Sequence, residues 1–173
     1  MENSRSTSPI WYLAALALTL AGWIIGVAIA GGAWDAVRHA PITSANQALQ
    51  AKGESIAVFT DVVQTDRRIT CSMIDVVRDA TPDPIPPAPI ALTVNDDGTT
   101  WNLVAFQPEG RDNVTVSCAP KDKQVDNAQY AYAAVDGFVE RARAGNFVIL
   151  GGFLGGIVLA IFVFMKRRRS SAH

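Results

Sequence analysis

The stretch FVILGGFLGGIVLAIFVFM, residues 147–165, is apolar and carries no charge. At roughly 1.5 Å of rise per residue, a helix of this length measures about 28 Å, close to the roughly 30 Å hydrocarbon core of a bilayer. A run of cations follows it at once: Lys166, Arg167, Arg168 and Arg169. Because basic segments beside a span are retained on the cytoplasmic side, we predict a transmembrane helix followed by a basic cytoplasmic tail, residues 166–173.

A second uncharged apolar segment, residues 9–32, lies near the N-terminus. Trp11 and Tyr12 open this segment and Trp34 follows it, as expected for aromatic side chains at the two membrane–water boundaries. We therefore predict a first transmembrane helix, preceded by a cytoplasmic tail of residues 1–8.

A cleaved signal peptide is the alternative for this N-terminal segment, because Ala28-Ile29-Ala30 is similar to a small-residue cleavage site. The apolar run is longer than the 7–15 residues typical of a signal peptide, which favours a retained helix. Under either interpretation, residues 33–146 lie outside the cytoplasm.

Both predicted spans contain small residues at helical spacing. Because lipid gives helices little hydrophobic reason to associate, close approach through small residues supplies the packing. We expect the two helices to pack together, and the doubled glycines of the second span to offer a further face to another membrane protein or a second copy. The alternative is that glycine is simply frequent in membrane helices. The positions are Gly22, Gly26, Ala30, Gly151, Gly152, Gly155, Gly156 and Ala160.

The segment between the spans alternates apolar and polar residues and is rich in β-branched side chains, which indicates strands. We predict a connector over residues 33–53 with a short helix near 45–51, a β-sandwich-like domain over 54–136, and a juxtamembrane helix over 137–146. The expected fold class is a membrane protein: a two-helix transmembrane hairpin plus a small all-β extracytoplasmic domain.

Two local signals inside this domain are specific. Asp97-Gly98 between apolar alternating runs predicts a tight hairpin turn. Residues 81–89 contain five prolines, which excludes a helix or central strand and favours a stiff surface connector of polyproline II type. Residues 129–135 fit a strand or a helix equally well.

The two cysteines, Cys71 and Cys118, both lie in the exported segment. Because that compartment is oxidising, we predict a disulfide; two buried free thiols are the alternative. In the chain-entropy model such a bond contributes about 3–4 kcal/mol. No further soft ligands accompany the cysteines, so no metal site is predicted.

The order of these features resembles a group of small actinobacterial envelope proteins, in which a β-rich exported domain with two cysteines stands between two membrane helices. The resemblance is carried by Gly53-Glu54-Ser55-Ile56-Ala57-Val58-Phe59, Cys71, Asp97-Gly98, Trp101, Phe106, Val114-Thr115-Val116-Ser117-Cys118, Tyr130-Ala131-Tyr132 and the basic tail. It implies fold and location and no reaction.

No catalytic residues and no cofactor are predicted: the exported segment has one histidine, His39, and no nucleophile-elbow glycine pattern surrounds Ser55, Ser72 or Ser117. The net charge of −1 argues against nucleic acid as a partner. We expect a non-enzymatic accessory subunit of a bacterial envelope complex, whose partners are the lipid bilayer and a membrane-protein complex or homo-oligomer. The alternative is a sensor or receptor for a lipid or glycan, which predicts a concave apolar pocket between the sheets instead of a filled core.

Overall fold

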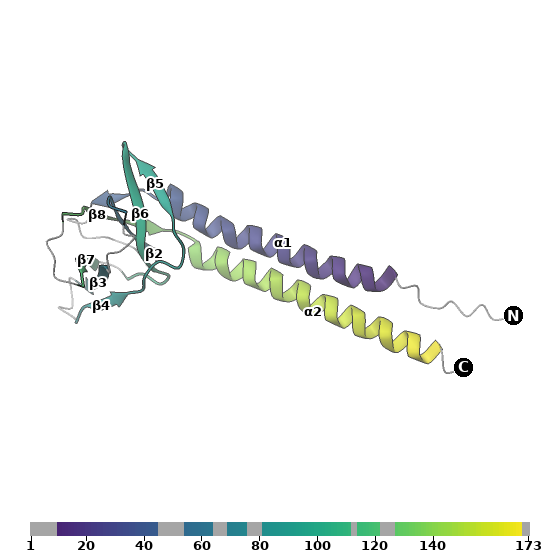
Figure 1. Cartoon of the computed structure of the whole chain (residues 1–173). Coiled ribbons are helices and arrows are strands. Elements are labelled where there is room, and N and C mark those ends of the chain that lie inside the picture. Colours follow the sequence, from purple (N-terminus) through teal and green to yellow (C-terminus); the bar gives the residue numbers. More distant parts are fainter. Residues whose placement is uncertain are drawn as a thin grey trace. The chain divides into compact units, whose positions relative to one another are not determined.

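The computed structural model describes residues 10–44, 54–63, 69–75, 81–111, 114–121 and 127–170 (Figure 1). The predicted short helix near 45–51 lies outside these residues. The chain forms two compact units: a helical unit within Met1–Gly32 and Glu140–His173, and a β unit within Ala33–Val139.

The helix α1 spans Ile10–His39 and therefore continues seven residues past the predicted boundary at 32. Ala33 and Val37 in this extension are buried, so packing keeps the last turns helical although they also contain charged residues. Arg38 and His39 stand in the final turn, where cations interact favourably with the helix dipole. Pro41 follows shortly and disfavours continuation.

The helix α2 spans Phe138–Ser170 without interruption. The predicted juxtamembrane helix (137–146) and transmembrane helix (147–165) are thus one element. The basic residues predicted as a tail continue this helix, and Arg167, Arg168 and Arg169 in its last turn complement the negative end of the helix dipole. The separate segments in our prediction reflected a change in polarity, which does not interrupt backbone hydrogen bonding.

The β unit consists of two antiparallel sheets, in agreement with the predicted β-rich domain. The first sheet has the order β1-β8-β2-β6-β5 and the second has the order β4-β3-β7. The strands are β1 Thr43–Ser44, β2 Ser55–Thr60, β3 Ile69–Asp75, β4 Asp83–Ile85, β5 Thr93–Asp96, β6 Thr99–Gln107, β7 Val114–Pro120 and β8 Tyr130–Val135. The segment 129–135, ambiguous in the sequence, is therefore mainly a strand.

One apolar core joins the two sheets. Its residues come from β2, β6 and β8 of the first sheet and from β3, β4 and β7 of the second: Ile56, Val58, Cys71, Met73, Ile85, Ala105, Val114, Val116 and Tyr132. All six residues of β2 are buried, because this strand lies at the centre of its sheet and both of its faces are covered. The alternation in the sequence located β2 but did not reveal that its second face is buried.

The turn between β5 and β6 confirms the predicted hairpin. Asp97 has φ 45° and Gly98 has φ 79°, the left-handed pair that a two-residue turn of type I′ requires. Glycine reaches this conformation without the steric penalty that a Cβ would add.

The proline-rich segment differs from the predicted surface connector. Asp83–Ile85 forms β4, which pairs with β3 at the edge of the second sheet. The chain then crosses to the first sheet and runs beside β6: the Ala88 amide donates to the Val104 carbonyl at 3.0 Å, and the Phe106 amide donates to the Pro86 carbonyl at 3.0 Å. Prolines fit because an edge segment needs few amide donors.

Candidate functional site

Small residues bring α1 and α2 together along the helical unit. We call this contact the helix seam, and it comprises Ala15, Thr19, Gly22, Gly26 and Ala30 of α1 with Gly145, Ile149, Gly152 and Gly156 of α2. A Cβ added at Gly22 would meet the Gly152 Cα at 2.6 Å, and one added at Gly145 would meet the Ala30 Cβ at 2.9 Å. The helices therefore run antiparallel, with backbones so close that neither position has room for a side chain.

Only some of the predicted packing residues take part in this contact. Gly22, Gly26, Ala30, Gly152 and Gly156 lie in the helix seam. A Cβ at Gly155 would lie 3.2 Å from the Leu18 side chain of α1, which would have to move slightly, whereas one at Gly151 would meet nothing within 4 Å. Ala160 is half-buried. The two members of the Gly151-Gly152 pair thus face differently, as the doubled glycines suggested.

The rest of the helical unit is covered by exposed large apolar side chains. On α1 these include Leu13, Leu16, Leu20, Trp23 and Ile24, and on α2 they include Leu150, Phe153, Leu154, Val158 and Phe162; their exposed fractions lie between 50% and 66%. Both helices are long and apolar enough to cross a membrane. Contiguous apolar surface on this scale is rare on soluble monomers and marks a site that contacts protein or lipid.

The predicted membrane-interface residues lie at the ends of these helices. Trp11 is 49% exposed and Tyr12 is half-buried, both at the start of α1. Lys166, Arg167, Arg168 and Arg169 are exposed in the last turns of α2, and the Arg168 guanidinium lies 5.4 Å from the centre of the Phe164 ring.

Trp34, also predicted at a membrane boundary, packs against other aromatic rings. It is half-buried in the β unit, where its ring lies 5.1 Å from Phe106 and 4.9 Å from Phe138, and those two rings are 4.5 Å apart. This aromatic cluster joins the last turns of α1, strand β6 and the start of α2. The sequence contained these rings more than thirty residues apart, so only the fold shows that they meet.

The predicted disulfide is present: Cys71 on β3 is bonded to Cys118 on β7. The two residues are directly opposite each other in the antiparallel register, so the bond links neighbouring strands of the second sheet. Cys71 is buried in the core shared by the two sheets. The bond therefore fixes the register of β3 against β7.

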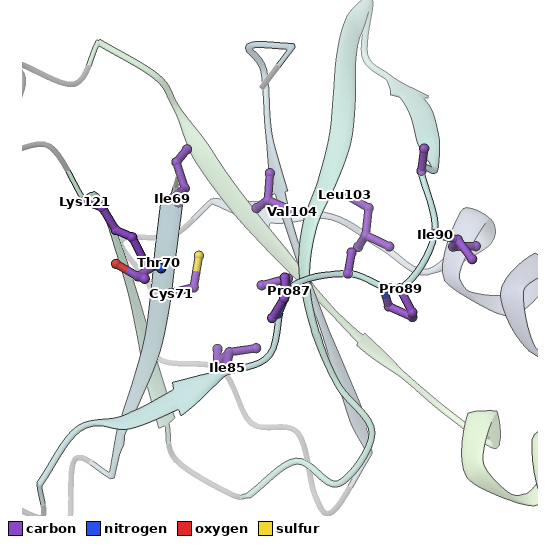
Figure 2. Close-up of a pocket in the computed structure, with 13 residues that line it drawn as sticks. Ile69, Thr70, Cys71, Ile85, Pro87, Pro89, Ile90, Leu103, Val104 and Lys121 are labelled. Atoms are coloured by element: carbon purple, nitrogen blue, oxygen red, sulfur yellow. The ribbon is translucent and has the colours of Figure 1, made fainter. Parts of the chain in front are cut away.

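A groove of about 530 Å³ opens in the β unit between the two sheets. Figure 2 shows Ile69, Thr70 and Cys71 of β3 on one side, and Leu103 and Val104 of β6 with Pro87, Pro89 and Ile90 on the other. The remaining lining residues are Ile85, Ala88, Ala91, Ala105 and Lys121. The volume lies within the range of roughly 300–1,000 Å³ that is typical of small-molecule sites.

An irregularity in β6 helps to form this groove. The register of β2 against β6 pairs Val58 with Ala105 and Phe59 with Leu103, so Val104 has no direct partner on β2. Such a bulge redirects side chains and is frequent near binding sites. Val104 lines the groove, and its carbonyl accepts the hydrogen bond from the Ala88 amide. The bulge and the proline-rich segment therefore build this wall together.

The groove is apolar apart from two side chains. Among the described lining residues only Lys121 carries a charge, and its side chain is exposed. The Thr70 hydroxyl donates to the Ala119 carbonyl at 3.2 Å, so its hydrogen is already used. An apolar ligand with one anionic group is complementary to these surroundings.

No sequence motif marks the groove residues as a site, although residues 84–91 carry a signal. This segment, PIPPAPIA, contains no polar side chain, and such a segment on a protein surface indicates a contact. The opposite wall of the groove comes from β3, which precedes this segment in the chain, and from Lys121, which follows it. No local sequence pattern identifies which residues face each other across the groove.

The described titratable residues outside the groove show no comparable arrangement. His39 is exposed, and its Nδ1 lies 2.9 Å from the Asp35 carbonyl oxygen, a contact local to the end of α1. Within the described part of the chain, His, Cys, Asp and Glu form no group of three or more that could hold a metal ion. The Ser55 hydroxyl is buried and donates to the Pro108 carbonyl at 2.6 Å.

Comparisons with known proteins found no matching family model, no similar curated protein and no similar solved structure.

Proposed function

We propose that the chain is a non-enzymatic binding protein of a bacterial cell envelope, in which α1 and α2 cross the plasma membrane as a hairpin. The β unit stands on the extracytoplasmic side and contacts another envelope component there. The N- and C-termini are cytoplasmic. Within a membrane complex, the protein acts as an accessory subunit.

The observation that carries this proposal is the apolar outer surface of the helical unit. Glycines fill the helix seam, while large apolar side chains point away from it. A soluble hairpin would do the opposite and bury its large apolar residues between the helices. Lipid removes the cost of exposing them, and small residues then give the closest helix contact.

Two further observations support the proposed orientation. The Cys71–Cys118 disulfide suits an oxidising compartment outside the cytoplasm. The cations at the end of α2 suit the cytoplasmic side. Because the helices run antiparallel, the start of α1 and the end of α2 lie at the same end of the helical unit, which agrees with two termini on one side.

The orientation can be tested with single cysteines, because the native pair is already bonded. Val63 is 69% exposed in the β unit, and Ser170 ends α2. We expect a membrane-impermeant maleimide to label Val63→Cys on intact cells, and to label Ser170→Cys only after the cells are lysed. The reverse pattern would place the β unit in the cytoplasm and refute the proposal.

The role as a subunit can be tested with two neighbouring glycines. Gly152→Leu pushes a side chain into the Gly22 backbone, and overpacking of this kind costs roughly 1–3 kcal/mol of stability. Gly151→Leu meets no atom of the chain within 4 Å and should leave the melting temperature unchanged. If the open face contacts a partner, Gly151→Leu lowers the amount of partner that co-purifies in mild detergent.

Quantitative mass spectrometry and thermal unfolding of both variants separate the two effects. Equal melting temperatures for Gly152→Leu and the native protein would contradict the helix seam. Unchanged co-purification with Gly151→Leu would contradict a partner on the open face.

A second candidate function is favoured by the groove. A receptor was expected to have a concave apolar pocket between its sheets, and the β unit has one beside a well-filled core. We therefore include ligand binding by the β unit in the proposed function.

A further inference from the structure

We infer that the groove between the two sheets binds the hydrocarbon chain of a fatty acid, with its carboxylate at Lys121. This inference rests on the proposed function, because it names the ligand of the extracytoplasmic binding unit.

The side chains that line the groove favour a hydrocarbon ligand over a sugar. Aliphatic and proline side chains make up nearly all of it, and none of the described lining residues is aromatic. A glycan would bring many hydroxyl groups to a groove in which, among the described residues, only Thr70 and Lys121 offer polar side chains, and each buried hydroxyl without a hydrogen bond costs free energy. A hydrocarbon chain needs no hydrogen-bond partner and gains free energy from leaving water. The structure thus separates the two ligand classes that the sequence left open.

The positive charge of Lys121 favours a ligand with an acidic group. Lys121 is the single charged side chain among the described residues of the lining, and Figure 2 shows it next to Thr70 at one side of the groove. Among the described lining residues neither Asp nor Glu occurs, so none of them places a negative charge opposite the ammonium group. A ligand with one negative charge complements it, whereas a cationic amphiphile does not.

The size limits the ligand to one chain. A volume of about 530 Å³ is in the range that encloses one drug-sized ligand. The lining on the proline side is exposed at Pro87, Pro89, Ile90 and Ala91. A bound hydrocarbon chain would remove these side chains from water, and burial of their apolar surface is the main source of affinity.

The experiment uses the full chain in nanodiscs of zwitterionic phospholipid and a photoactivatable palmitic acid that carries an alkyne. We expect labelling in peptides that contain residues 85–91 and 103–105. Ala91→Trp fills the groove from an exposed position and should abolish this labelling. Ser117→Trp is the matched control: Ser117 is exposed on β7, and neither Ser117 nor Ser72, its partner on β3, lines the groove.

A charge reversal tests the role of Lys121. Lys121→Glu should weaken labelling by palmitic acid by up to about fivefold, the usual scale for an exposed ion pair. The same variant should gain labelling by a probe with the same chain and a trimethylammonium head. Arg143→Glu changes an exposed cation on α2 and should alter neither result.

Several outcomes would overturn the inference. One is labelling confined to α1 and α2 in every variant, which would mean that the probe only partitions into the bilayer. Another is equal labelling of Ala91→Trp and the native chain. Competition by chitotetraose that matches competition by palmitic acid would assign the groove to a glycan. These results are independent of the maleimide experiment, so a failed orientation and a failed ligand assignment can be told apart.

Discussion

Phe106→Ala is expected to lower the stability of the β unit by about 3–5 kcal/mol, the usual cost of removing a buried aromatic side chain. Phe106 is only 3% exposed and contacts both other rings of the aromatic cluster. Its loss leaves a cavity between Trp34 and Phe138, and ring pairs of this geometry add roughly 0.5–1.5 kcal/mol each beyond their buried area.

The measurement is denaturant unfolding of the full chain in nanodiscs, followed by near-UV circular dichroism. Val63→Ala serves as the control, because Val63 is 69% exposed and such surface changes usually stay within about 0.5 kcal/mol. Hydrogen exchange should also rise at residues 33–39 and 138–139, since the cluster holds these helical turns in the β unit. Equal unfolding midpoints for Phe106→Ala and Val63→Ala would show that the cluster does not support the fold.

Replacement of both cysteines, Cys71→Ser with Cys118→Ser, is expected to cost about 3–4 kcal/mol. The bond joins residues 47 positions apart in sequence, and in the chain-entropy model a crosslink of this span restricts the unfolded chain by that amount. For a unit of this size, the melting temperature should fall by at least about 10 °C.

Reduction provides the internal control for the disulfide. Dithiothreitol should lower the melting temperature of the native chain to nearly that of the double variant, and should not affect the double variant. Each single variant should match the double variant, because either change removes the whole bond. Full stability of the reduced native chain would mean that core packing alone maintains the register of β3 against β7.

Much of the architecture follows from local sequence patterns. Apolar runs without charge indicated α1 and α2, and alternation indicated β2, β3 and β7. Asp97-Gly98 defined its turn, because the residues that tolerate left-handed backbone are few. The two cysteines in a segment expected outside the cytoplasm indicated their bond. In each case the physical cause lies within a few residues or in the compartment.

The groove and the aromatic cluster could not be predicted in this way. Val104 lines the groove because β6 bulges against β2, and the opposite wall comes from β3, more than thirty residues earlier in the chain. Trp34 meets Phe106 and Phe138 only after α1, β6 and α2 have taken their places.

For this protein, the sequence by itself determined which segments are long apolar helices, that the segment between them is rich in strands, and where the Asp97-Gly98 turn and the disulfide lie. Only the tertiary structure decided that residues 83–92 connect the two sheets, that Gly152 packs against α1 while Gly151 does not, and that a groove opens beside the core. The reason is that hydrophobic period and turn chemistry act between neighbouring residues, whereas strand pairing and the shape of a groove depend on residues that are distant in the chain.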